Sequence, residues 1–187
     1  SKTGTVTKND DKSLTVTGGG TVTKADGSKI ADVTGDFTVK ADGTIVLPSG
    51  STATTSEGKT VTGPAEITPD GGIKVAEGGN VDIDGPGGSK DPIEGPAEVG
   101  TDGKTKYIVP GPNGTYGDED DVKVTPSETG TVTKNDDKSL TVTVGGEVTK
   151  ADGTAIAEVT GDFTVKADGT IVLPSGSTAT SLEGNIV

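Results

Sequence analysis

The sequence predicts an all-β protein, and in particular a β-solenoid built from short two-strand coils. Three observations favour this fold. Thr occurs 32 times and Val 21 times in 187 residues, and both side chains favour strands. Apolar and polar residues alternate in short runs, and no stretch has apolar residues at helical spacing. Segments of 15–17 residues recur, separated by corners rich in Gly and Pro, which together number 41 (31 plus 10).

Each segment predicts a strand, a turn, a second strand and a corner. In the segment that begins at Asp36, Phe37 and Val39 alternate with polar residues, and Ile45 and Leu47 do the same after an Asp-Gly turn. Eight consecutive segments begin at Thr5, Thr21, Asp36, Ser51, Glu66, Val81, Glu98 and Thr115. The positions equivalent to Phe37 hold Val6, Val22, Ile67, Val99 and Tyr116.

One segment carries too few apolar side chains for a core of its own, so the segments must bury one another's faces. In a solenoid each segment is one coil, and like residues stack in parallel ladders. In the alternative, tandem antiparallel sandwich or hairpin modules, each segment is a hairpin that turns at Ala41-Asp42-Gly43. The near-constant period favours the solenoid, and the scarcity of aromatic residues argues against a wide sandwich core. Val, Ile, Leu and Phe total 38 of 187, which leaves disorder as a third alternative.

A second repeat has a period of 126 residues. Residues 3–58 align without a gap with residues 129–184, and 49 of these 56 positions are identical. The differences include Gly18/Val144, Thr21/Glu147 and Asp32/Glu158. We therefore expect residues 1–126 to form one complete unit of eight coils, and residues 127–187 about half of a second unit, continuous with the first. Such near-identity indicates recent duplication, and we expect the chain to be a fragment of a longer array.

Composition excludes several classes of function. The formal charge of −13 disfavours nucleic acid and anionic membrane surfaces, because no basic patch is present to neutralise phosphates. No apolar run is long enough to insert into a bilayer. The absence of Cys and His removes disulfides, the commonest general base and the thiol nucleophile. We therefore expect that the protein is not an enzyme and binds no certain cofactor.

One motif resembles a calcium-binding loop. Asn80, Asp82 and Asp84 alternate before Gly85, and Asp91 follows at the twelfth place, which fits the loop spacing with two departures. Asn80 carries no charge, and Asp91 is shorter than the usual Glu. The four residues are thus a candidate Ca²⁺ site. The alternative is an ordinary strand with Val81 and Ile83 inward and a polar outer face.

Two further features lie in the irregular stretch 81–130. Asp118-Glu119-Asp120-Asp121 is a dense acidic run, which predicts either a cation site or a solvated loop. Asn113-Gly114-Thr115 is a glycosylation sequon, meaningful only in a host that uses it. This stretch departs most from the strict period, so a protein partner would be expected to bind there.

The stretches GTIVLPSGSTAT at 43–54 and GPAEITPDGGIKV at 63–75 resemble the Gly/Thr/Val/Pro-rich repeats of large surface proteins of Gram-positive bacteria. The resemblance covers the whole chain and is compositional. It implies an extracellular, cell-surface stalk or adhesin region. The expected function is a stiff spacer or filament-forming rod whose uncapped ends associate end to end. The alternative is an adhesin module that recognises a host or partner protein through an outer face near 81–130.

Overall fold

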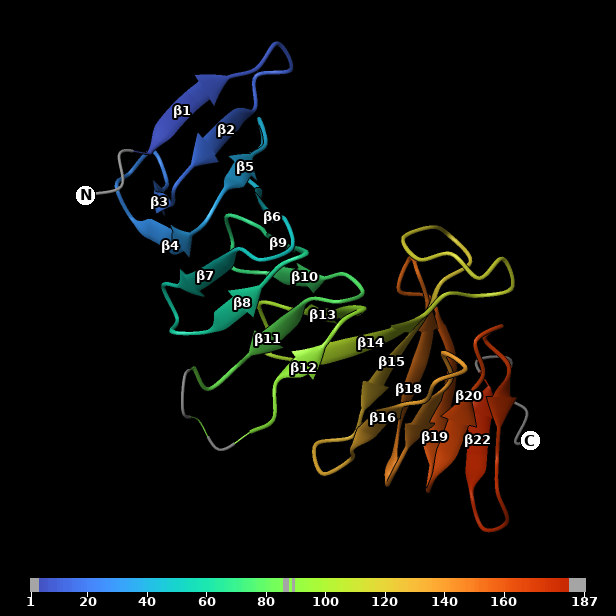
Figure 1. The fold of residues 1–187 in the computed structure, drawn as a ribbon. Helices are drawn as coiled ribbons and strands as arrows, with labels where there is room; N and C mark the ends of the chain where they lie inside the picture. The colour runs from blue at the N-terminus through green and yellow to red at the C-terminus, as the bar shows by residue number, and fades with distance from the viewer. Residues whose placement is uncertain (1–3, 86–87, 89, 182–187) are drawn as a thin grey trace. The chain divides into compact units, whose positions relative to one another are not determined.

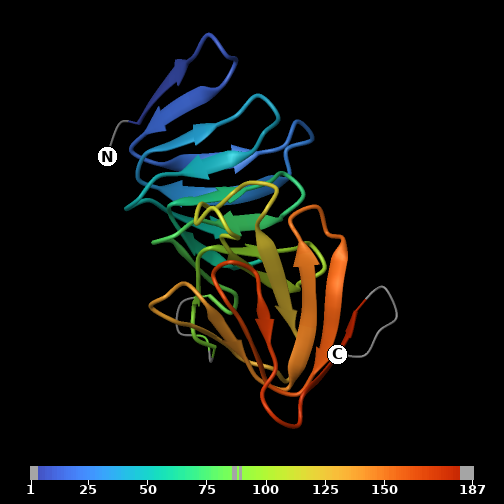
Figure 2. The same cartoon turned by 90° about the vertical axis from the view of Figure 1, so that its right-hand side faces the viewer.

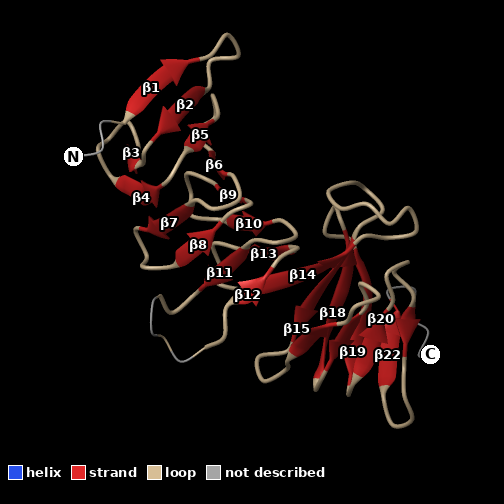
Figure 3. Ribbon diagram, in the orientation of Figure 1, coloured by secondary structure: helices blue, strands red, loops and turns tan. Residues whose placement is uncertain are grey.

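The computed structural model describes residues 4–85, 88 and 90–181, and over these residues it contains strands and turns but no helix (Figures 1 and 3). The all-β prediction is therefore confirmed. The chain divides into two compact units, an N-terminal unit, Ser1–Gly103, and a C-terminal unit, Lys104–Val187. In the described residues, no helix has the length and apolar character needed to cross a bilayer.

The N-terminal unit contains two sheets, here called sheets 1 and 2. Sheet 1 has the order β1 (Thr5–Lys8), β2 (Leu14–Thr17), β5 (Phe37–Val39), β6 (Ile45–Leu47), β9 (Ala65–Ile67), β10 (Ile73–Val75) and β13 (Ala97–Val99). Sheet 2 has the order β3 (Gly20–Thr23), β4 (Lys29–Thr34), β7 (Thr52–Thr55), β8 (Thr60–Thr62), β11 (Asn80–Asp82) and β12 (Ile93–Glu94).

Successive segments of the N-terminal unit are hairpins that alternate between the two sheets. The hairpin β1–β2 lies in sheet 1, β3–β4 in sheet 2, and β5–β6 in sheet 1 again. Each hairpin then pairs with the hairpin two places along the chain, as β2 does with β5 and β4 with β7. Both sheets therefore grow in chain order, one hairpin at a time (Figure 2).

The prediction of parallel ladders is wrong, because every assigned pair of strands is antiparallel. The strand-turn-strand reading of each segment is confirmed for the segment at Asp36, where Phe37, Ile45 and Leu47 are buried. The physical reason lies in the turn. A five-residue turn reverses the chain within one sheet, so the two strands of a segment bond to each other.

Eight turns share one hydrogen-bond pattern, which the turn from Lys40 to Thr44 illustrates. The Lys40 amide donates to the Thr44 carbonyl (2.8 Å), and the Gly43 amide donates to the Lys40 carbonyl (2.9 Å). Gly43 has a φ of 88°, and Asp42 accepts a bond from the Thr44 amide (2.9 Å). The same two backbone bonds close the turns at 9–13, 24–28, 55–59, 68–72, 135–139, 150–154 and 166–170. This recurrent turn makes the short hairpins possible.

Glycines at the corners allow the chain to cross between sheets. A Cβ added to Gly63 would lie 2.2 Å from the Pro48 carbonyl oxygen, and one added to Gly95 would lie 2.1 Å from that of Ala76. No side chain fits at such distances from backbone. The corner glycines are therefore required by close approach of two backbone segments.

The C-terminal unit also contains two sheets, here called sheets 3 and 4. Sheet 3 has the order β14 (Thr105–Val109), β15 (Val122–Pro126), β18 (Gly145–Lys150), β19 (Ala155–Thr160) and β22 (Thr178–Ser181). Sheet 4 has the order β16 (Val132–Lys134), β17 (Leu140–Val142), β20 (Phe163–Val165) and β21 (Ile171–Val172).

One core joins the two sheets of the C-terminal unit. Its buried members are Val109, Val122, Val124, Val148, Val159, Ala157 and Ala179 of sheet 3 and Leu140, Val142, Phe163 and Val165 of sheet 4. The sheets therefore pack face to face and share their inward side chains. Tyr116, which was predicted to lie in a strand, lies instead in the loop between β14 and β15.

The two copies of the repeat fold alike. The described residues of the first copy, 4–58, lie in the N-terminal unit, and those of the second copy, 129–181, lie in the C-terminal unit. Val6 pairs with Val16 as Val132 pairs with Val142, and Leu14 pairs with Val39 as Leu140 pairs with Val165. The boundary between the compact units lies at residue 103, whereas the sequence repeat has a period of 126 residues.

Candidate functional site

The predicted calcium loop lies around strand β11. Asn80 pairs with Glu94 on one side and Thr62 on the other, so it is part of a ladder. Val81 is fully buried, and Asn80 and Asp82 are half-buried, as expected for a strand with a polar outer face, whereas Ile83, also expected to point inward, follows the end of β11 and is half-buried. The Asp82 carboxylate accepts a bond from the Asp84 amide (3.2 Å).

Asp91 is exposed and lies ahead of β12, and three residues of the intervening loop (86, 87 and 89) fall outside the described part of the chain. Among the described residues, no three His, Cys, Asp or Glu side chains gather into a group that could hold a metal ion. Calcium binding by Asn80, Asp82, Asp84 and Asp91 stays a prediction. A melting temperature that chelator leaves unchanged would contradict it.

The acidic run 118–121 belongs to an ordered loop built around Asn113. The Asn113 side chain donates to Asp118 (2.8 Å) and to Asp120 (2.7 Å), and the Thr115 hydroxyl also donates to Asp118 (2.8 Å). A hydrogen bond between the two carboxyls lowers the pKa of Asp118 to about 2 and raises the pKa of Asp120. Asp121 is buried, and its carboxylate accepts a hydrogen bond from the Gly117 amide (2.7 Å). The run therefore stabilises its own loop through side-chain hydrogen bonds.

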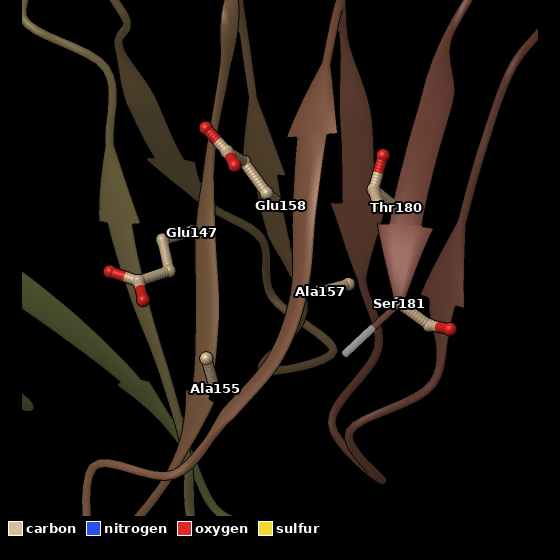
Figure 4. A pocket seen from close by; sticks show the side chains of 6 residues that line it. All are labelled: Glu147, Ala155, Ala157, Glu158, Thr180 and Ser181. Carbon is tan, nitrogen blue, oxygen red and sulfur yellow. The ribbon is translucent and has the colours of Figure 1, made fainter. Parts of the chain in front are cut away.

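A hollow of about 410 Å³ lies at strands β18, β19 and β22 of sheet 3 (Figure 4). Glu147 and Glu158 line it from neighbouring strands, together with Thr180 and Ser181 of β22. In the first copy the equivalent carboxylate, Asp32, has both a Thr21 hydroxyl and a Lys29 ammonium at hydrogen-bond distance. The second copy has Ala155 in place of that lysine. Among the described residues, no lysine forms an ion pair with Glu147 or Glu158, so the hollow has two like charges on its lining.

The most distinct surface feature is an apolar groove at the start of the N-terminal unit, called here the end groove. It has a volume of about 550 Å³. Its lining includes Val6, Leu14, Val16, Phe37 and Val39 of sheet 1 and Gly20–Thr23 of β3 in sheet 2. The Val6 side chain is 65% exposed and Leu14 is 36% exposed. In the described residues, β3 has a strand partner on one side only, namely β4.

Comparison of the chain with protein-family models, with curated proteins and with solved structures found no match.

The end groove was not predicted from the sequence. A signal for it was present: the two copies are nearly identical, and within residues 1–187 the segment with Val109, Val122 and Val124 stands directly before the second copy. The same apolar residues therefore meet different neighbours in the two copies. A comparison of what precedes each copy would have predicted the uncovered side chains.

Proposed function

We propose that the chain is a structural repeat of an elongated extracellular surface protein, in which it acts as a stiff spacer or filament-forming rod. The observation that carries this proposal is the growth pattern of the N-terminal unit. Each hairpin joins the sheet of the hairpin two places earlier, and both sheets extend in chain order. A sheet that grows in this way has no closing strand, so each further hairpin adds length.

In this proposal the hairpin takes the role that a coil has in a solenoid. Side chains alternate between the core and solvent along short strands, and successive hairpins bury one another's apolar faces. The net charge of −13 keeps neighbouring rods apart and supports a role that involves no nucleic acid. The extracellular location rests on the resemblance of the repeats to those of Gram-positive surface proteins.

Small-angle scattering on chains of one, two and three 126-residue repeats tests the spacer function. If the chain is a rod, the maximum dimension measured by scattering should increase by the same increment with each added repeat. A dimension that grows only with the cube root of chain length would show compact folding and would overturn the proposal. The same samples, measured over a range of concentration, test whether the ends associate.

The loop between β14 and β15 favours a second function, recognition of a partner protein. Side-chain hydrogen bonds join Asn113 and Thr115 to Asp118, and Asn113 to Asp120, within this loop, and loops positioned by a scaffold of strands often carry binding residues. The loop lies within the stretch 81–130, where an adhesin face was predicted. Replacement of residues 112–120 by a short Gly-Ser linker should abolish adhesion to host cells if the loop binds, and should leave the spacer dimension unchanged.

A further inference from the structure

We propose that the end groove is a docking site for a β-hairpin with the sequence chemistry of residues 105–126, supplied by a further copy of the repeat. The inference rests on the proposed structural function, because a repeat array is what provides such hairpins. It goes further by naming the surface, the occupant and the register of the contact.

The second copy of the repeat shows how the same groove is filled. Leu140, the counterpart of Leu14, is 1% exposed, whereas Leu14 is 36% exposed. Val148 is fully buried, whereas its counterpart Val22 is only half-buried. Thr149 is buried, whereas its counterpart Thr23 is exposed. The difference lies in the neighbours, because these residue types are identical in the two copies.

The hairpin β14–β15 covers the groove of the second copy. Val109, Val122 and Val124 of this hairpin belong to the same buried core as Leu140 and Val148. Strand β15 extends sheet 3 by pairing with β18, which is the counterpart of β3. One hairpin thus occupies the apolar groove and also pairs with the strand that borders it.

The register of the contact follows from the second copy. There Val124 lies opposite Val148, Lys123 opposite Thr149 and Thr125 opposite Glu147. A docked hairpin would therefore place its Val124 opposite Val22, with antiparallel pairing to the open side of β3. Val122 and Val124 stand on alternate positions of one strand, so both can point into the core.

The side chains of β3 suit this occupant. Thr21 takes the place of Glu147, so the docked Thr125 would meet a neutral hydroxyl instead of a carboxylate. Strand addition of this kind combines main-chain hydrogen bonds with apolar side chains in pockets. The expected partner is thus a hairpin that carries the pattern Val-Lys-Val-Thr on its pairing strand.

An extended chain tests the proposal. Residues 104–128 are placed directly before Thr3, so the added hairpin precedes the first copy as the native hairpin precedes the second, and the two hairpins are 126 residues apart. We expect those amides of Gly20–Thr23 that face the open side of β3 to exchange with solvent at least tenfold more slowly than in the original chain, and fluorescence of the dye ANS to fall. The matched control carries the same extension with Val122→Asp and Val124→Asp in the added copy only, and should behave like the original chain.

A second arm uses the original chain and the synthetic peptide 104–128. Saturable chemical-shift changes at Val6, Leu14 and Val22 that the doubly Asp-substituted peptide does not produce would support the site. Equal exchange rates for the extended chain and its control would overturn the proposal. Self-association of the original chain that Leu14→Asp abolishes would also overturn the proposal. The occupant of the end groove would then be the folded surface of another molecule of the chain, not an added hairpin. Scattering dimensions of the repeat series are measured separately, so failure of the spacer function is distinguishable from failure of this site.

Discussion

Glu147 and Glu158 lie directly opposite each other on β18 and β19, and both side chains are exposed. Like charges at directly opposed positions of an antiparallel pair destabilise the sheet. The equivalent positions of the first copy hold Thr21 and Asp32, with a hydrogen bond of 2.6 Å between them. The two copies therefore differ in cross-strand energy at one defined place.

Replacement of Glu147 by Thr should stabilise the protein by about 0.5 kcal/mol, since it removes the repulsion and restores the pairing of the first copy. Chemical denaturation at low salt measures the change. The reciprocal substitution Thr21→Glu is the matched control and should destabilise. A gain that persists unchanged in 1 M salt would show that charge repulsion is not the cause.

Replacement of Val144 by Gly should stabilise the protein by about 1 kcal/mol. Val144 has a φ of 68°, a left-handed conformation that is strained for a β-branched residue, and its side chain is 53% exposed. Its counterpart in the first copy is Gly18, with a φ of 81°. Gly18→Val should be destabilising by a similar amount. If Val144→Gly, Gly18→Val and the original chain were equally stable, the left-handed backbone of Val144 would not be strained.

Lys12 and Lys138 occupy the turn position that Gly43 holds in its hairpin, with φ values of 68° and 64°. Lys12→Gly should stabilise by about 1 kcal/mol through relief of the left-handed backbone. Lys138→Gly should stabilise less, because its ammonium lies 5.5 Å from the Tyr116 ring centroid and that contact is worth about 0.5 kcal/mol. Thermal melting of the two variants checks the order, and a larger gain at Lys138 would contradict it.

Leu14→Ala and Leu140→Ala should differ sharply in their effects, although they change the same residue in the same sequence context. Leu140 is fully buried, and its truncation should cost about 3 kcal/mol. Leu14 is substantially exposed, and its truncation should cost less than about 1 kcal/mol. Denaturant unfolding of both variants measures the difference. Equal costs would mean that Leu14 is already covered in solution.

Acid should destabilise the hairpin turns. Hydrogen bonds from the Ser or Thr two residues later lower the pKa of six turn aspartates, Asp11, Asp26, Asp42, Asp137, Asp152 and Asp168. Because the folded pKa lies below the unfolded value, this stabilisation is present above about pH 4 and is lost as the pH falls through the folded values. Relief of the net negative charge acts in the opposite direction, so matched variants are needed.

Asp42→Asn and Asp168→Asn keep the acceptor oxygen but remove the titration. The fall in melting temperature between pH 6 and pH 2 should be smaller in the double variant than in the original chain. The Asp118–Asp120 pair, in which one pKa is lowered and the other is raised, is present in both proteins and therefore does not contribute to the difference between them. An identical fall in both proteins would exclude the turns as the acid-sensitive element.

Sequence periodicity predicted the strands and turns well, because alternation in Phe37–Val39 and Ile45–Leu47 and the Asp-Gly turn between them are local properties. The period of 15–17 residues did not determine whether the strands pair parallel or antiparallel. A segment of 15 residues fits a coil or a hairpin equally, and the turn at Lys40–Thr44 decides for the hairpin through two backbone bonds. Tyr116 was misplaced because its segment has one strand only, β15.

The spacing of the calcium motif does not distinguish a metal-binding loop from an ordinary strand. The spacing of Asn80, Asp82 and Asp84 is also the spacing of outward positions on a strand, and β11 supplies such a strand up to Asp82. The end groove escaped prediction for a different reason. Burial of Leu14 or Leu140 depends on a neighbouring hairpin, and no property of the residue itself records whether that hairpin is there.

The alternation of hairpins between two sheets restricts how such a chain can change its length during evolution. If recombination removed one hairpin from the N-terminal unit, every later hairpin would have to cross to the opposite layer, and β2 would meet a new partner in place of β5. Loss of two consecutive hairpins would leave each survivor in its own layer. Gains and losses in steps of about thirty residues are therefore the ones that this architecture accommodates.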